Sequence, residues 1–441
     1  MKLNYPRTFT VGLAFFSICA FWQLYDHVVP LMLKFTFGIN DAVAGGVMAI
    51  DNVLALFMLP LFGTLSDKTR TRWGRRMPYI VLGGFASCAA MMLIPVANRY
   101  ASLPLFVAGL GLTLLLMATY RSPAVALMPD VTVKPLRSMA NAVINLMGAV
   151  GGMIILVLTP VMLPSEPGEG SGGLEVYSPD YVPLFLLCMG IMVVATLVLI
   201  LRVNEPKLVA QMHKDAKTWG VEEDAPDTPK NTERVPLPPE VRRSMMFLLA
   251  SVALWFMGYN AVTTSFSKYC AVRFGIGAGG SARVLLVATV AAVVSYLPVG
   301  ALAQRIGRKK VILGGVGMLG VAFAAGGFFP DFTPLLYPLF VMAGMAWAAI
   351  NINSYPMVVE MSRGADVGRF TGYYYTASMA AQTLTPILSG AALEYINYWT
   401  LFPYGALFVG LSFITMLFVR HGDSRPEPPA NKLEAFEEMD G

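Results

Sequence analysis

Long apolar stretches separated by polar connections constrain this chain more than any other feature. A helix of about 20 residues crosses the hydrocarbon core of a bilayer, and twelve stretches of roughly that length or more can be drawn. They run over residues 8–36, 41–65, 78–98, 103–128, 138–163, 181–203, 244–272, 281–303, 310–330, 333–359, 370–395 and 397–420. Because 56% of the 441 residues are hydrophobic and 13% are charged, a water-soluble fold would lack polar surface. We predict an all-α membrane protein with twelve transmembrane helices, the first of them retained because no small-residue cleavage site follows it.

Lysine and arginine residues gather in alternate connections between these stretches. Five cations lie from Lys68 to Arg76, and eight more lie from Arg202 to Arg243. Residues 37–40 and 164–180 hold none. Connections on the cytoplasmic side retain Lys and Arg, so both termini are expected in the cytoplasm and the chain in the cell (inner or plasma) membrane. The net charge of +5 follows this alternation and does not indicate a nucleic-acid partner.

The two parts of the chain repeat each other. GTLSDKTRTRWGRR at residues 63–76 resembles GALAQRIGRKK at residues 300–310, and Gly74 and Gly307 are separated by 233 positions. Pro123 and Pro356 are separated by the same number. Two matches at one offset indicate a duplication. We therefore predict six-helix halves at 1–203 and 244–421, a cytoplasmic linker at 204–243 with little fixed structure, and a cytoplasmic tail at 422–441.

Twelve spans in two parallel halves, together with this loop motif, resemble the major facilitator superfamily. In that family the motif Gly-x-Leu-x-Asp-cation-x-Gly-Arg-cation forms a cytoplasmic latch that holds one of two gate states. The resemblance implies that the latch here includes Asp67, Arg75, Arg76, Asp130 and Arg308. The alternative is that the loop only sets the topology.

Residues 66–80 (SDKTRTRWGRRMPYI) and 120–148 carry a finer resemblance, to the glycoside–pentoside–hexuronide:cation symporters and the sucrose transporter family. It implies a sugar or glycoside moved with a proton or sodium ion. Ala55 and Leu59 stand where the sodium symporters carry two aspartates, so a sodium site is not expected. Val125 stands where the sucrose transporters carry an arginine, and Arg121 lies one turn earlier.

Ionisable residues inside predicted spans are candidates for function, because a charge in the hydrocarbon core is costly. Asp51 lies about ten residues into its span, or roughly 15 Å along a helix, close to the midplane. Asp26 lies in the outer part of the first span. We predict that Asp51 and Asp26 couple transport to protons, since an apolar surrounding raises the pKa of a carboxyl group. Arg121 is expected to serve as a counter-charge or as a hydrogen-bond donor to the substrate.

The remaining ionisable residues in the spans receive plainer interpretations. His27 is either functional or a residue of a wetted cavity. Lys34 and Lys268 lie near the outer ends of their spans, where the ammonium group can extend to the interface. Glu394 lies near a span end and needs no special role.

Other polar and aromatic residues recur at helical spacing, which places each set on one helix face. Hydroxyl and amide groups match the hydroxyls of a sugar, and an aromatic ring can stack on its apolar face; such stripes can also hold helices together. The predicted substrate-binding residues are Arg121, Trp22, Gln23, Tyr120, Asn141, Asn145, Tyr259, Asn260, Trp347, Asn351 and Gln382.

The sequence thus favours a secondary active transporter of a sugar or glycoside, a proton-coupled symporter that works by alternating access in the bilayer as a monomer. One alternative is an exporter of amphipathic compounds, although Gly148 to Gly152 lacks the proline of the corresponding exporter motif. A membrane-embedded enzyme or receptor is the other, but no metal-ligand set, nucleophile–base pair or phosphate loop is present. We therefore expect no enzymatic activity, no metal and no cofactor.

Overall fold

The computed structural model describes residues 3–133, 136–163, 179–221, 238–361 and 367–423. These residues form helices and no strand of a sheet. In chain order the elements are α1 (Tyr5–Leu31), the π-helix η1 (Met32–Thr36), α2 (Asp41–Lys68), α3 (Met77–Met91), α4 (Leu93–Arg99), α5 (Leu103–Asp130), α6 (Arg137–Met162), α7 (Val182–Arg202), α8 (Glu205–Thr218), α9 (Pro239–Arg273), α10 (Ala278–Ile306), α11 (Arg308–Gly326), α12 (Leu336–Glu360), α13 (Val367–Tyr395), the 3-10 helix η4 (Tyr398–Thr400) and α14 (Leu401–Leu417).

Eleven helical segments within the described residues are long and apolar enough to cross a membrane. They agree with eleven of the twelve predicted spans, and the third predicted span is built from α3 and α4 together. The remaining predicted span, 370–395, is α13, a helix of 29 residues that is rich in hydroxyl and amide side chains and is not among the eleven. It packs in the bundle against α2 and α9. The all-helical membrane fold is confirmed, and the number twelve stays a prediction.

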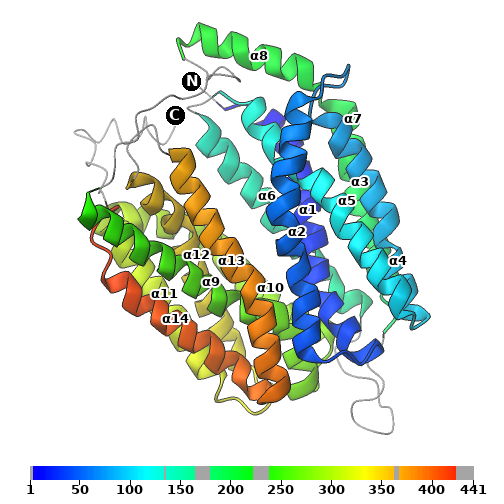
Figure 1. The fold of residues 1–441 in the computed structure, drawn as a ribbon, viewed down its shortest axis with the longest axis vertical. Helices are drawn as coiled ribbons and strands as arrows, with labels where there is room; N and C mark the ends of the chain where they lie inside the picture. The colour runs from blue at the N-terminus through cyan, green and yellow to red at the C-terminus, as the bar shows by residue number, and fades with distance from the viewer. Residues whose placement is uncertain (1–2, 134–135, 164–178, 222–237, 362–366, 424–441) are drawn as a thin grey trace.

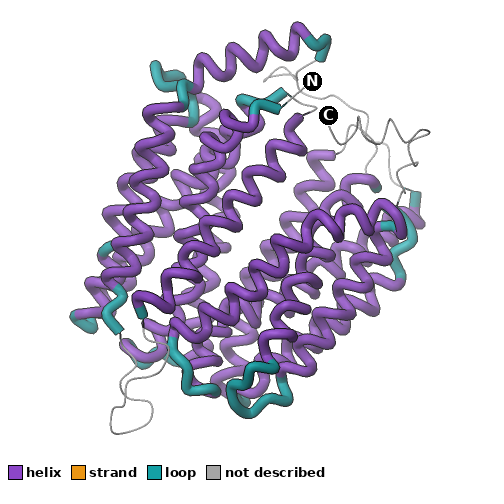
Figure 2. The backbone as a smooth tube through the Cα atoms, turned by 180° about the vertical axis from the view of Figure 1, so that it is seen from behind, coloured by secondary structure: helices purple, strands orange, loops and turns teal. Residues whose placement is uncertain are grey.

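The helices build two hydrophobic cores. One consists of buried residues from Leu3 to Val203, joined by Ala271 and Ala278, and the other of buried residues from Met245 to Val419. Figures 1 and 2 show the corresponding groups of helices side by side. We call them the N-terminal and C-terminal halves; each is stabilised mainly by burying its own apolar side chains.

The two halves contact each other through α2 against α13, α6 against α10 and α1 against α9. The start of α1, the end of α14 and α8 lie at one end of the bundle, which we call the termini end, and the halves lie closest together at the other, the far end (Figures 1 and 2). Glycine permits backbone contact there. A Cβ on Gly45 of α2 would lie 1.9 Å from the carbonyl oxygen of Pro386, and one on Gly390 of α13 would lie 2.3 Å from that of Asp41.

The prediction that the linker has little fixed structure is wrong for its first part, because α8 is a helix (Figure 1). The Asn204 side chain caps it by accepting a hydrogen bond from the backbone N–H of Lys207 at 3.2 Å, a common helix-start geometry. Met212 and Ala216, four residues apart, are buried with Val133. Apolar groups at this spacing form one helix face, so α8 packs on the N-terminal half.

Candidate functional site

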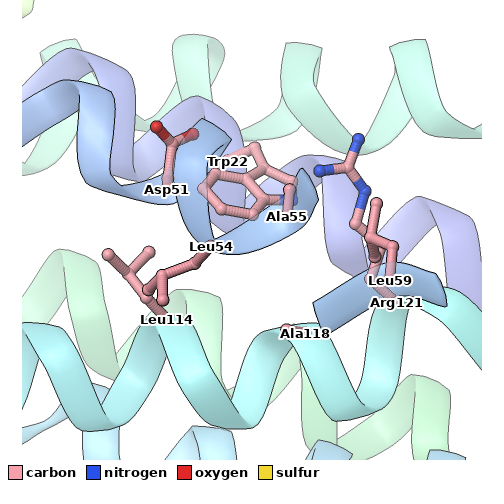
Figure 3. Close-up of a pocket in the computed structure, with 8 residues that line it drawn as sticks. All are labelled: Trp22, Asp51, Leu54, Ala55, Leu59, Leu114, Ala118 and Arg121. Atoms are coloured by element: carbon pink, nitrogen blue, oxygen red, sulfur yellow. The ribbon is translucent and has the colours of Figure 1, made fainter. Parts of the chain in front are cut away.

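A small pocket opens between α1, α2 and α5 in the N-terminal half. Its lining consists of Trp22, Asp51, Leu54, Ala55, Leu59, Leu114, Ala118 and Arg121, which Figure 3 shows as sticks. Its empty space of about 250 Å³ includes space that is open to solvent, so the pocket is a narrow opening and not an enclosed ligand site. The pocket by itself therefore accommodates part of a solute rather than a whole disaccharide.

Charged groups of opposite sign share this otherwise apolar pocket. The Arg121 guanidinium lies 5.5 Å from the centre of the Trp22 ring, within the range of a cation–π contact, and in Figure 3 that ring is drawn between Arg121 and Asp51. Asp51 accepts a hydrogen bond from the Asn52 amide at 2.8 Å. Asp26 does not line the pocket, although it lies within range of the charges of Asp51 and Arg121. The structure thus brings one predicted coupling acid, Asp51, and the predicted counter-charge to the same pocket.

The two residues that replace the sodium-binding aspartates line this same pocket. Asp51, Ala55 and Leu59 recur every four residues along one face of α2, so the carboxylate lies one turn, about 6 Å, from Ala55. On α5 the guanidinium belongs to Arg121, whereas Val125, one turn later, is half-exposed. The carboxylate of Asp51 and the guanidinium of Arg121 therefore face the same space from neighbouring helices.

Aromatic and amide groups form a second cluster in the C-terminal half. The rings of Tyr259 on α9 and Trp347 on α12 stack with centroids 3.6 Å apart and planes 4° from parallel. The Asn260 amide nitrogen is buried and has no partner among the described residues. Asn351 lies near the Tyr296 hydroxyl. A flat ring pair beside the free Asn260 amide can bind the apolar face and the hydroxyls of a sugar.

Further predicted binding residues lie on α1, α6 and α13. Asn141 and Asn145 are exposed on α6, and Gln23 packs beside Gly152 of that helix. Gln382 donates a hydrogen bond from its amide to the Ser378 carbonyl at 3.3 Å within α13. Asn141 and Asn145 lie near the termini end of the bundle. Exposure of their amide groups to water costs far less free energy than exposure to lipid would.

Tyr120 lies elsewhere, and its predicted role as a ligand needs correction. Its side chain is fully buried, and its hydroxyl is hydrogen-bonded to Ser17 at 2.6 Å and donates to the Ala14 carbonyl at 3.2 Å. Successive residues of an α-helix point about 100° apart. Arg121 therefore faces the pocket while Tyr120 points into the core and joins α5 to α1.

Four of the five predicted latch residues, Asp67, Arg75, Arg76 and Asp130, form one ion-pair network at the termini end of the N-terminal half. Arg76 is buried, and its Nε donates to Asp130 at 2.8 Å while its Nη2 pairs with Asp67. The Nη2 atom of Arg75 lies 2.7 Å from the other Asp130 oxygen. The network joins the ends of α2, α3 and α5.

Glu205, the first residue of α8, completes this network and was missed in the sequence. Its carboxylate is buried and accepts hydrogen bonds from the backbone N–H groups of Arg75, Arg76 and Met77, each with a contact of 2.9 Å. These are free N–H groups at the start of α3, where a negative charge is favourable. Gly74 has a φ of 108°, and a Cβ there would lie 2.3 Å from Glu205. The motif glycine therefore provides the space that the carboxylate occupies.

The C-terminal half repeats this arrangement. Arg308 forms an ion pair with Glu360 at the end of α12. Asp423, just after α14, accepts a hydrogen bond from the backbone N–H of Lys309 at 3.1 Å, and Gly307 has a φ of 95°. In each half, an acid that follows the last long helix caps the helix after the motif glycine.

At the far end, the interpretations given to Lys268 and Glu394 are wrong. Lys268 is 3% exposed and donates to Asp41 of the other half at 2.9 Å, so its ammonium group does not extend to an interface. Glu394 accepts a hydrogen bond from the backbone N–H of Asp41 at 2.9 Å. His27 is buried, with Nε2 2.9 Å from the Ala278 carbonyl of the other half. These contacts join the two halves, and no spacing in the sequence indicated them.

Within the described part of the chain, no group of three His, Cys, Asp or Glu side chains is placed to hold a metal ion. The four cysteines are free, and Cys88, Cys188 and Cys270 are buried.

Two helical halves that meet around charged and aromatic groups define a polytopic membrane protein of the transporter class. A family model described as Major Facilitator Superfamily matches residues 11–296 and 283–438, and the chain belongs to that superfamily.

The known proteins that this chain resembles are consistent with membership of that superfamily. An uncharacterized symporter of Synechocystis sp. is 29% identical over 189 residues, 40% of this chain and 35% of that protein. A sucrose transport protein of Arabidopsis thaliana is 28% identical over 152 residues, 30% of this chain and 25% of that protein. The matched part thus spans about a third or less of either relative. The xylose transporter XylE from E. coli, solved in an inward-open conformation, shares the fold with a TM-score of 0.67, 12% identity and full coverage of both chains.

Proposed function

We propose that this protein is a proton-coupled symporter of a sugar or glycoside. The observation that carries the proposal is the pocket in which Asp51 and Arg121 lie on either side of Trp22, with Asp26 within reach of both charges. A charge inside a bilayer is costly and is a candidate for function. The similarity to a sucrose transport protein and to a symporter supports the choice of substrate class and of symport.

We assign the termini end to the cytoplasm and count α13 as the twelfth span. The alternation of Lys and Arg between connections supports the orientation. The far end then faces outward. The polar contacts between halves seen among the described residues, such as His27 to Ala278 and Lys268 to Asp41, lie at that outer end. We therefore infer that the conformation described is inward-facing.

The proposed solute site lies between the halves. The pocket supplies Trp22 and Arg121, and the opposite half supplies the stacked Tyr259 and Trp347 rings with Asn260. A sugar presents hydroxyls at its edge and C–H groups on its face, so amide groups and aromatic rings on both sides match it. Because each half contributes contacts, the solute can stabilise a state in which the halves close around it.

Coupling follows from the charge of the two acids. A protonated Asp51 leaves a neutral pocket wall beside Arg121 that a neutral sugar can contact. When the site opens inward, water reaches the carboxyl group, which can release its proton. Asp26, the other carboxyl group in this part of the N-terminal half, is the second candidate for the coupling acid.

The test uses purified protein in liposomes that carry one ion gradient at a time. A screen of mono-, di- and trisaccharides by thermal shift first identifies a ligand, since a ligand stabilises the state it binds. Uptake of that ligand should follow an imposed pH gradient and should not respond to a sodium gradient, because Ala55 and Leu59 offer no oxygen ligands. Accumulation driven by sodium alone would overturn the proton assignment, and accumulation of amphipathic compounds instead of sugars would favour the exporter.

A further inference from the structure

Five residues at the far end form a compact polar group, which we call the far-end cluster: Lys34, Asp41, Lys268, Glu394 and Tyr398. Asp41 lies at its centre and is fully buried. Its Oδ1 accepts from Lys268 at 2.9 Å, its Oδ2 accepts from Lys34 at 3.0 Å, and the Tyr398 hydroxyl also donates to Oδ2. Both carboxylate oxygens of Asp41 are therefore bound to cations.

The members of the cluster come from both halves. Lys34 and Asp41 belong to the N-terminal half, while Lys268, Glu394 and Tyr398 belong to the C-terminal half. Each half thus contributes one cation and one anion. The side chains of Asp41 and Lys268 are 0% and 4% exposed, whereas those of Lys34 and Glu394 are 27% and 28% exposed. The pair of Asp41 with Lys268 joins the halves and is buried, and a second pair between the halves, Lys34 with Glu394 at 3.8 Å, lies at its rim.

This division of charge matters when the halves separate. A buried ion pair that loses one partner leaves an uncompensated charge, which is strongly unfavourable. Asp41 has a second cation, Lys34, in its own half. Lys268 has a second anion in its own half, Glu394, which lies in the same cluster because it accepts from the Asp41 backbone N–H at 2.9 Å and pairs with Lys34 at 3.8 Å. Separation of the halves breaks both of these contacts of Glu394, so neither charge of the buried pair has to be left alone.

We propose that the far-end cluster is an exchange gate. In the closed state Asp41 bridges Lys34 and Lys268; on opening, Asp41 keeps Lys34 while Lys268 moves to Glu394. The backbone contact of α2 with α13 at Gly45 and Gly390, one turn or less from Asp41, holds the cluster in register when it is closed. The inference requires only that the halves separate at this end, and it does not depend on the solute or on the coupling ion.

The proposal predicts unequal effects for the two lysines. Lys268→Gln removes the buried contact with Asp41 at 2.9 Å in the closed state and only a contact at the rim with Glu394 in the open state, so it favours opening. Lys34→Gln removes a contact with Asp41 that is present in both states and a longer, partly exposed contact with Glu394 at 3.8 Å in the closed state, so it favours opening less. Lys268→Arg keeps the charge but not the compact ammonium group, so it should raise opening less than Lys268→Gln.

Ala271 offers a reporter of the open state. It lies on α9 one turn beyond Lys268 and is 8% exposed, buried against the N-terminal half. The experiment measures the rate of maleimide labelling of Ala271→Cys in purified protein, in a background whose four native cysteines are changed to alanine. Lys268→Gln should raise the rate about tenfold, the factor that corresponds to the loss of one hydrogen bond between charged groups. Lys34→Gln should raise it by less than about fivefold, the upper range for a partly exposed ion pair.

Tyr398→Phe is a milder second variant that keeps the ring and removes one donor to Asp41. It should raise the labelling rate less than Lys268→Gln, and it keeps the test decisive if that variant fails to fold. An unchanged rate in both variants, or equal increases for Lys268→Gln and Lys34→Gln, would overturn the exchange gate. Because labelling needs neither sugar nor proton gradient, its failure is distinguishable from failure of the proposed transport activity.

Discussion

Replacement of Glu205 by Gln tests whether the first residue of α8 holds the cytoplasmic network together. The carboxylate accepts hydrogen bonds from three backbone N–H groups at the start of α3. Glutamine has one acceptor oxygen, and its NH₂ group would face N–H donors. Hydrogen bonds to a charged group contribute about 1.5–3 kcal/mol, and the negative charge at a helix start adds about 0.3–1 kcal/mol. We expect a loss of about 2–4 kcal/mol in the free energy of unfolding, with an earlier release of α8.

Glu240→Gln is the matched control, since Glu240 lies in the first turn of α9 and is exposed. Its effect should stay within about 0.5 kcal/mol, as for most surface substitutions. The assay is equilibrium unfolding in mixed detergent micelles, combined with proteolysis of the segment after α8. If Glu205→Gln and Glu240→Gln change the free energy of unfolding by the same amount, the carboxylate does not hold the network together. The argument from helix capping is then refuted.

Three further substitutions test other parts of the account. Gly74→Ala should destabilise the N-terminal half about as much as Glu205→Gln, because its Cβ would collide with Glu205 and its φ of 108° is strained for alanine; folding at parental stability would show that the carboxylate can move aside. Asp67→Asn should leave folding intact, since Arg76 keeps Asp130, but should change cysteine labelling at the termini end; unchanged labelling and uptake would leave the loop a purely topological signal. Tyr120→Phe should lower the thermal unfolding midpoint without changing sugar affinity, and a selective loss of binding would restore Tyr120 to the site.

The membrane fold could be predicted from the sequence because hydropathy is a local property. A stretch of about 20 apolar residues needs no distant partner to be recognised, and eleven predicted spans correspond to helices of the required length. The helix α13 is harder to recognise as a membrane span from its sequence. Its polar side chains are expected to face a cavity, and they lower the mean hydropathy of the helix. The helix α8 carried local signals, namely Asn204 before Pro206 and an apolar pair at Met212 and Ala216, but the charged residues around them favoured an unstructured linker.

The candidate site could be predicted in part. Asp51, Asp26 and Arg121 were identified because each is charged within an apolar stretch, and that argument needs only the position along the span. Tyr120 was misplaced because spacing along a helix identifies a shared face but not which face meets the cavity. The pair of Lys268 with Asp41 joins residues 227 positions apart. No single-sequence pattern connects them, so the lysine was interpreted by its nearness to a span end.

The measurement that tests the central claim most directly is a paired one on purified Asp51→Asn, with equilibrium binding and gradient-driven uptake determined on the same preparation. Asparagine reproduces the shape and hydrogen bonding of the protonated acid but cannot release a proton. The account predicts that the variant binds the sugar with nearly parental affinity and exchanges it across the membrane, yet fails to concentrate it under a pH gradient. If Asp51→Asn concentrates the sugar as the parent does, Asp51 is not the coupling acid.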